Sequence, residues 1–276
     1  MTLDYQALCF IPLALAVICG LYRWQGAALF WLWLTAMSAL VVGVMSPMAL
    51  IYALLGLALA MLLPRLKGKL LHLGWLLLLL WLVPLLLHQA PGFNNPLVLQ
   101  AVHSGPLSSS FSMYLNFDRA LIFFALLMAW PQLSGPGGPV KPRLLLATIP
   151  ALGGIILLAW LLGAVKPEWS LPQWVWLFAL NNLLITCVTE EALFRGLLQQ
   201  WFSRLFGNAA GLIIAAVLFG VAHLAGGGVM VVLATLAGLV YGLAFYASGR
   251  LWVAIVLHFA FNLIHLLFFT YPMLAR

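Results

Sequence analysis

About ten apolar runs follow one another along the 276 residues, separated by charged residues or by clusters of proline and glycine. Most of these runs can cross a ~30 Å hydrocarbon core, which takes about 20 apolar residues. Lipid leaves only helices or closed barrels as spanning structures, and leucine-rich runs without two-residue alternation exclude a barrel. The chain is therefore predicted to be all-α, a polytopic integral membrane helical bundle with about eight to ten transmembrane helices.

Some segments fit this pattern less well and indicate how the chain is divided. The runs at 8–22, 120–130 and 209–224 are shorter than the ~17 residues that an untilted crossing needs. The polar stretch 89–118 is predicted to be an extramembrane loop, and 131–143 is predicted to be a proline- and glycine-rich linker. We therefore expect two regions: residues 1–140, a transmembrane region of unassigned role, and residues 141–276, which hold all the carboxylates that lie within spans.

Composition excludes several classes of protein. A chain that is 66% hydrophobic and 6% charged is not a soluble domain, so the lipid bilayer is its first expected partner. The formal net charge is +7, but the basic residues stand singly between apolar runs, as membrane orientation requires, and form no nucleic-acid-binding patch. No nucleic-acid partner is expected. Cys9, Cys19 and Cys187 have no metal-type spacing and are predicted to be small buried hydrophobes.

The main functional signal is the pair of carboxylates Glu190 and Glu191 inside an apolar run. Each charge in hydrocarbon costs several kcal/mol, so such residues usually face a protein interior or a water-filled cavity and serve a function there. Arg195 lies four residues after Glu191, on the same helix face, and is predicted to neutralise it. Glu190 points elsewhere and is predicted to face a cavity as a base. The alternative is that all three residues form a buried network that only ties helices together.

Two further polar sites lie on the following spans. Phe219 and His223 are four residues apart, which allows the aromatic ring to shield or orient the imidazole. His258 and Asn262 have the same spacing on the last span and present an imidazole and a carboxamide from one face. His265 continues that stripe, and we expect it to be structural.

Together these groups supply a carboxylate base, two imidazoles and an amide donor. Hydrolysis of a peptide bond needs a group that activates water, donors where negative charge develops on the carbonyl oxygen, and a pocket that excludes bulk water. The bilayer interior provides the last of these conditions.

The three sites, Glu190-Glu191-x-x-x-Arg195, Phe219-x-x-x-His223 and His258-x-x-x-Asn262, resemble in their order the three motifs of the CPBP family. This family comprises CAAX proteases and bacteriocin-processing proteins and is also called the Abi family. The resemblance covers about residues 174–269, and residues 1–140 lie outside it.

The resemblance implies an intramembrane endopeptidase of the glutamic type. Glu190 would activate the water, His223 would assist it, and His258 with Asn262 would stabilise the oxyanion. Glu191, Arg195 and Phe219 would support these groups. The implied partner is a membrane-tethered protein or peptide substrate, no cofactor is implied, and the implied location is the bacterial inner (cytoplasmic) membrane.

Three other interpretations stay open from the residues. Zinc held by His223, His258 and a glutamate would make a metalloprotease, although no H-E-x-x-H pair is present. Intramembrane Glu and His also mark proton pathways in transporters, although no inverted repeat is visible. A non-catalytic immunity protein could keep the same scaffold without turnover.

Overall fold

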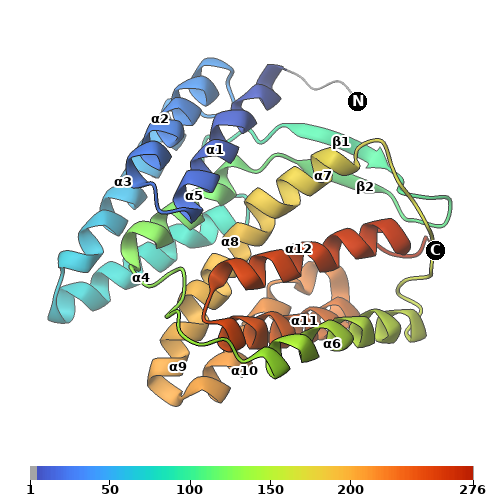
Figure 1. Cartoon of the computed structure of the whole chain (residues 1–276). Coiled ribbons are helices and arrows are strands. Elements are labelled where there is room, and N and C mark those ends of the chain that lie inside the picture. Colours follow the sequence, from blue (N-terminus) through green and yellow to red (C-terminus); the bar gives the residue numbers. More distant parts are fainter. Residues whose placement is uncertain (1–4, 276) are drawn as a thin grey trace. The chain divides into compact units, whose positions relative to one another are not determined.

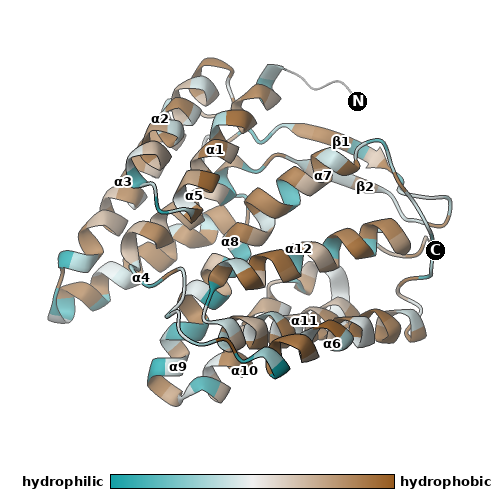
Figure 2. Cartoon of the chain, in the orientation of Figure 1, coloured by the Kyte–Doolittle hydropathy of each residue, from teal (hydrophilic) through white to brown (hydrophobic). Residues whose placement is uncertain are grey.

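The computed structural model describes residues 5–275 and shows a predominantly helical chain. Six helices are long and apolar enough to cross a membrane, and hydrophobic residues dominate them along their length (Figure 2). These six are Pro47–Arg65, Gly68–Leu86, Pro142–Leu161, Val175–Phe206, Leu224–Ser248 and Leu251–Phe268. The predicted polytopic, all-α membrane fold is therefore confirmed.

Shorter helices account for most of the remaining predicted spans. Three apolar helices are shorter than 18 residues: Tyr5–Leu21, Gln25–Val41 and Asn208–Val221. The run predicted at 120–130 forms α5 (Phe117–Ala129), whose 13 residues measure about 20 Å at 1.5 Å per residue and fall short of the hydrocarbon core. With six long and three shorter apolar helices in the described part of the chain, ten full-length spans are too many.

The chain forms two compact units, and the first contains the amino-terminal helices. It comprises the chain up to Gln100 together with Ser112–Pro131 and Leu184–Thr189. Its α1 packs on α2 and α5, and α5 also contacts α3 and α4 (Figure 1). The bounds of its helices are η1 (Tyr5–Cys9), α1 (Phe10–Leu21), α2 (Gln25–Val41), α3 (Pro47–Leu62), η2 (Leu63–Arg65), α4 (Gly68–Leu86) and α5.

Local chemistry explains how α3 begins and how it meets α4. The Ser46 hydroxyl accepts a hydrogen bond from the Ala49 amide, and Pro47 occupies the first helical position, where no amide donor is needed. Further along, the Tyr52 hydroxyl donates to the Trp81 carbonyl at 2.6 Å, while the Trp81 indole donates to the Tyr52 carbonyl at 3.0 Å. This reciprocal pair fixes the register of the two helices.

The polar stretch predicted as a loop contains a two-stranded sheet, which the prediction missed. Its strands are β1 (Leu97–Val102) and β2 (Phe111–Tyr114), each too short to give a clear two-residue pattern. In the first unit the stretch is anchored by the buried Asp118, whose carboxylate accepts hydrogen bonds from Asn95 and from His88.

The second unit contains every residue of the three motifs. It comprises Ala101–Phe111, Gln132–Leu183 and Glu190–Arg276. Its α11 packs on α6, α10 and α12, and Figure 1 shows α6, α11 and α12 running alongside one another. The bounds are α6 (Pro142–Leu161), α7 (Val175–Asn181), η3 (Asn182–Cys187), α8 (Val188–Glu191), η4 (Ala192–Gln199), α9 (Gln200–Phe206), α10 (Asn208–Val221), η5 (Leu224–Gly226), α11 (Gly227–Ser248) and α12 (Leu251–Phe268).

Small residues bring α10 and α11 close together. A Cβ atom placed on Gly238 would lie 3.1 Å from the Ala216 Cα, and one placed on Gly220 would overlap the Thr235 hydroxyl. Close backbone approach of this kind is how helices associate in lipid, where no hydrophobic driving force acts between them. The same approach leaves the Gly238 carbonyl within reach of the motif residues.

The cysteine prediction is confirmed, since Cys9, Cys19 and Cys187 are all buried. The functional division at residue 140 stays a prediction.

Candidate active site

Glu190 and Glu191 end the short segment α8, between two turns of π-helix, η3 and η4. Single π-turns inside α-helices are rare and occur frequently at functional sites. Glu190 is 6% exposed, and Glu191 and Arg195 are completely buried. Three ionisable side chains of one largely apolar helix are thus buried in the protein interior.

Arg195 pairs with Glu191, as the four-residue spacing predicts. Its Nη1 donates to Glu191 Oε1 at 2.9 Å, and its Nη2 donates to the Gly238 carbonyl of α11 at 2.9 Å. The guanidinium also lies over the Phe219 ring, 4.6 Å from its centroid. A buried cation therefore has a carboxylate, a backbone oxygen and an aromatic face around it, which offsets the cost of removing it from water.

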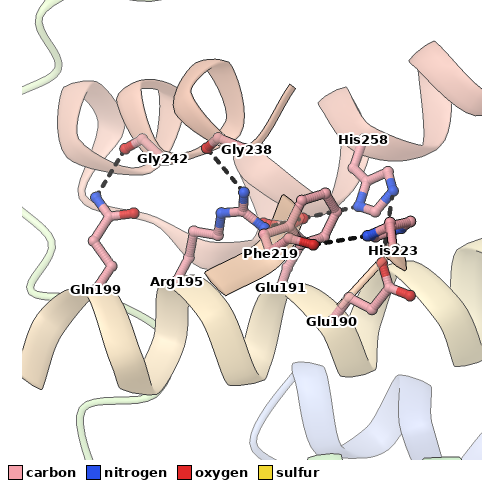
Figure 3. Close-up of polar contacts among 9 residues, drawn as sticks. All are labelled: Glu190, Glu191, Arg195, Gln199, Phe219, His223, Gly238, Gly242 and His258. Atoms are coloured by element: carbon pink, nitrogen blue, oxygen red, sulfur yellow. Dashed lines mark hydrogen bonds and ion pairs between the residues drawn. The ribbon is translucent and has the colours of Figure 1, made fainter. Parts of the chain in front are cut away.

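His258 lies between the two glutamates, a contact that sequence spacing did not reveal. Its Nδ1 is 2.8 Å from Glu191 Oε1, and its Nε2 is 4.0 Å from Glu190 Oε2 (Figure 3). Because a carboxylate only accepts, the Nδ1 carries the proton of that bond. A single oxygen of Glu191 thus accepts from both Arg195, as predicted, and His258, a second partner that the prediction did not include.

Tyr241 of α11 is a further site residue that the sequence reasoning missed. Its ring stacks on the His258 imidazole with centroids 4.5 Å apart and an interplanar angle of 18°. Phe219 meets the same imidazole edge-on at 5.8 Å. Little in the sequence pointed to it, because α11 also carries the aromatic residues Phe245 and Tyr246. These two rings fix the plane of His258.

His223 follows the carboxy-terminal end of α10 and is oriented by Phe219, as predicted. Its Nδ1 lies 2.8 Å from the Phe219 backbone carbonyl, and the two rings are 4.7 Å apart. A carbonyl accepts only, so Nδ1–H donates and the neutral ring has its lone pair on Nε2. Figure 3 shows His223 at the same end of the site as Glu190 and His258.

Asn262 lies one turn after His258 on α12 and pairs with a residue outside the three motifs. Its Nδ2 donates to the Asn182 Oδ1 at 3.2 Å. Asn182 opens the π-turn η3 on the helix that carries the glutamates. Consecutive carboxamides at 181 and 182 in a leucine-rich span were the signal that could have pointed to it.

A cavity of about 220 Å³ opens beside these residues. His223, His258 and Asn262 line it together with Phe219 and Tyr241, and residues of α6, of α11 and of the segment after α12 contribute to the rest of the wall. Glu190 is not among the described residues that line this cavity, and its Oε2 lies 4.0 Å from the Nε2 of His258, which does line it.

His265 also lines the cavity, and its Nε2 lies 3.2 Å from the Thr270 carbonyl. This bond ties α12 to the segment after it, which agrees with the structural role expected for this residue. Gln199 forms a similar tie, donating from Nε2 to the Gly242 carbonyl at 2.9 Å (Figure 3).

Comparison with known proteins gives one match. The family model described as "Type II CAAX prenyl endopeptidase Rce1-like" matches residues 172–264. Residues 172–264 form an Rce1-like domain of the CPBP/CAAX protease family. Neither the curated proteins nor the solved structures gave a match.

The match covers the whole of the three motifs and agrees with the family resemblance found in the sequence. An Rce1-like domain supports intramembrane protease activity on a protein substrate. Together with the apolar helices it makes the chain an integral membrane protein.

Proposed function

We propose that the second unit is an intramembrane endopeptidase in which Glu190 activates a water molecule against a peptide bond of a membrane-tethered protein or peptide. The observation that carries this proposal is the placement of His258 between the two buried glutamates, at the wall of a cavity. A purely structural network would need one carboxylate to satisfy Arg195. The second carboxylate instead lies beside an imidazole that reaches the cavity.

The gap between Glu190 and His258 suits a water molecule. Their facing atoms are 4.0 Å apart, which is too long for a direct hydrogen bond and short enough for one water to contact both. In the proposed reaction Glu190 takes a proton from that water while the water oxygen attacks the substrate carbonyl carbon. The carbon–nitrogen bond then breaks, and the proton passes from Glu190 to the leaving amine.

We propose that His223 assists this proton transfer. Its Nδ1–H is bound to the Phe219 carbonyl, so Nε2 is the atom with a lone pair to accept a proton or to orient the water. The Phe219 ring packs on it and limits its rotation.

His258 and Asn262 are proposed to stabilise the oxyanion. Both line the cavity from one face of α12, and each has a nitrogen to donate. For His258 to donate from Nε2 while Nδ1 donates to Glu191, the ring must carry both protons, and the two carboxylates beside it supply the compensating charge. Donors fixed in advance at the developing charge are usually the largest single contribution to catalysis.

The supporting role proposed for Glu191 and Arg195 rests on the same geometry. Glu191 fixes the Nδ1 side of His258, and Arg195 holds Glu191 in place while binding the Gly238 carbonyl of α11. The long helix that carries the glutamates is thereby joined to α12 through Glu191 and to α11 through Arg195.

The test of this function is cleavage by purified protein in detergent micelles of two quenched fluorescent peptides. One ends in a farnesylated Cys-aliphatic-aliphatic-X sequence, and the other carries an apolar membrane-spanning tail without a lipid. Hydrolysis of either peptide at an internal bond, identified by mass spectrometry, supports an endopeptidase, and the preferred peptide reports its substrate class. Intact peptides after prolonged incubation with folded protein would contradict the proposal and favour a non-catalytic role.

The zinc alternative needs a separate experiment. Among residues 5–275 no group of three or more His, Cys, Asp or Glu side chains is arranged to hold a metal ion. Zinc ligation would use His223 and His258 as neutral donors, so removing either would release the metal and chelation would stop the reaction. We expect less than one equivalent of zinc by elemental analysis and unchanged activity after dialysis against a chelator. Stoichiometric zinc that is lost in His223→Ala, with activity restored by added zinc, would establish the metalloprotease instead.

A further inference from the structure

Asn182 precedes the glutamate motif on the same helix and has no role in the proposed mechanism. It is 8% exposed and stands with Asn181 in residues 175–185, a stretch that is otherwise apolar. Polar side chains in such positions usually face the protein interior and have a function there. Asn182 belongs to none of the three motifs.

Its contact with Asn262 crosses between two helices far apart in the sequence. Asn262 Nδ2 donates to Asn182 Oδ1 at 3.2 Å, over a separation of 80 residues. Asn182 and Glu191 lie on one continuous helix, and Asn262 and His258 lie on α12. The two helices are therefore joined by two polar contacts, one at each of the proposed oxyanion donors.

We propose that Asn182 is a positioning residue that turns the nitrogen end of the Asn262 amide toward the reacting carbonyl. This inference rests on the proposed function. The terminal torsion of an asparagine has a broad, roughly two-fold energy profile, so backbone and packing alone leave the amide two opposite orientations. An oxyanion donor must present nitrogen, because the amide oxygen would repel the developing negative charge. Asn182 Oδ1 is an acceptor and selects the orientation in which the Asn262 Nδ2 faces η3, and the second hydrogen on that nitrogen is the one proposed to reach the substrate.

The alternative is a structural role, in which this bond only holds two membrane helices together, as interhelical hydrogen bonds between asparagines do. The two roles differ in what they change. Helix association alone changes stability and leaves the catalytic rate of the folded protein untouched. Orientation of Asn262 changes kcat, with little effect on KM.

The experiment compares Asn182→Leu with its matched control Asn181→Leu, using whichever of the two quenched peptides the wild-type protein cleaves. Leucine has the same number of side-chain heavy atoms as asparagine, with the same branching at Cγ, and suits an apolar helix, so both variants should insert and fold. We expect Asn182→Leu to lower kcat about tenfold, a part of the 10²–10³-fold loss of a donor itself, with KM changed less than about twofold. Asn181→Leu should stay within about twofold of wild type. Asn182→Asp keeps an acceptor oxygen at the same place and should recover part of the lost rate.

A double-mutant cycle with Asn262→Ala decides whether Asn182 acts through Asn262. Once Asn262 is gone, Asn182→Leu should cause no further loss of kcat. Wild-type kcat in Asn182→Leu, or losses that multiply in the double variant, would overturn the positioning role. If Asn182→Leu fails to fold, Asn182→Asp carries the test, and a kcat as low as that of Asn262→Ala would overturn the role.

Failure of this inference is distinguishable from failure of the proposed function. Wild-type turnover in Asn262→Ala would remove the oxyanion role of Asn262 itself. Slow turnover in Asn262→Ala with wild-type turnover in Asn182→Leu would refute only the positioning role.

Discussion

Replacing Arg195 by methionine tests how far the site depends on its buried ion pair. Methionine keeps most of the apolar stem and removes the charge, so Glu191 is left as a buried carboxylate that accepts a hydrogen bond from His258 and has lost its cation. Breaking a buried pair in this way costs about 3–5 kcal/mol. Since melting temperatures of proteins of this size shift by about 2–4 °C per kcal/mol, we expect a fall of roughly 6–20 °C.

The assay is thermal unfolding in detergent, followed by intrinsic fluorescence of the 12 tryptophans. Arg204→Met is the matched control, because Arg204 lies on the same long helix, is exposed and hydrogen-bonds to the Gln132 side chain. Its effect should be within about 0.5 kcal/mol, or roughly 2 °C.

The double variant Glu191→Gln/Arg195→Met tests whether the loss comes from the unpaired charge of Glu191. Removing both charges leaves no unpaired ion, so the double variant should melt above Arg195→Met. A normal melting temperature in Arg195→Met, or strictly additive losses in the double variant, would show that Glu191 does not depend on Arg195.

Three further outcomes follow from the contacts at the site and around it. His258→Ala and Asn262→Ala should each lower kcat by about 10²–10³, measured by peptide cleavage, and an effect confined to KM would reassign them to substrate recognition. Tyr241→Leu should lower kcat while Tyr241→Phe keeps most of it, because phenylalanine preserves the ring stacked on His258; equal rates in both variants would deny the stack a role. Gly220→Val should lower the melting temperature in detergent, since its side chain would overlap Thr235 of α11, and an unchanged temperature would show that α10 and α11 can separate at no cost.

Helical spacing predicted the contacts that lie within one helix. Glu191 with Arg195, and Phe219 with His223, are four residues apart and meet as expected. The π-turn η4 begins directly after Glu191, yet the pair is formed.

Contacts between helices could not be read from spacing. His258 reaches Glu191 across 67 residues, and Asn262 reaches Asn182 across 80, so both depend on how α12 packs against the long helix. Crossing angles and helix rotation are set by side-chain packing, which a hydrophobic period does not specify.

The apolar runs predicted a membrane protein and most of its long helices, but short runs did not predict full-length spans correctly. The run at 120–130 became α5, which carries Asp118 and Arg119 in its first turn, and the loop 89–118 gained two strands. Composition reports what lipid or a protein core will accept. It does not distinguish a short buried helix from a full span.

The central claim is that the Glu190 carboxylate activates the water, and Glu190→Gln tests it most directly. Glutamine keeps the shape and hydrogen-bonding capacity of the side chain and removes the base. We expect that the variant inserts and melts like the wild-type protein while cleavage of the quenched peptides falls to background. Turnover at the wild-type rate in folded Glu190→Gln would contradict it.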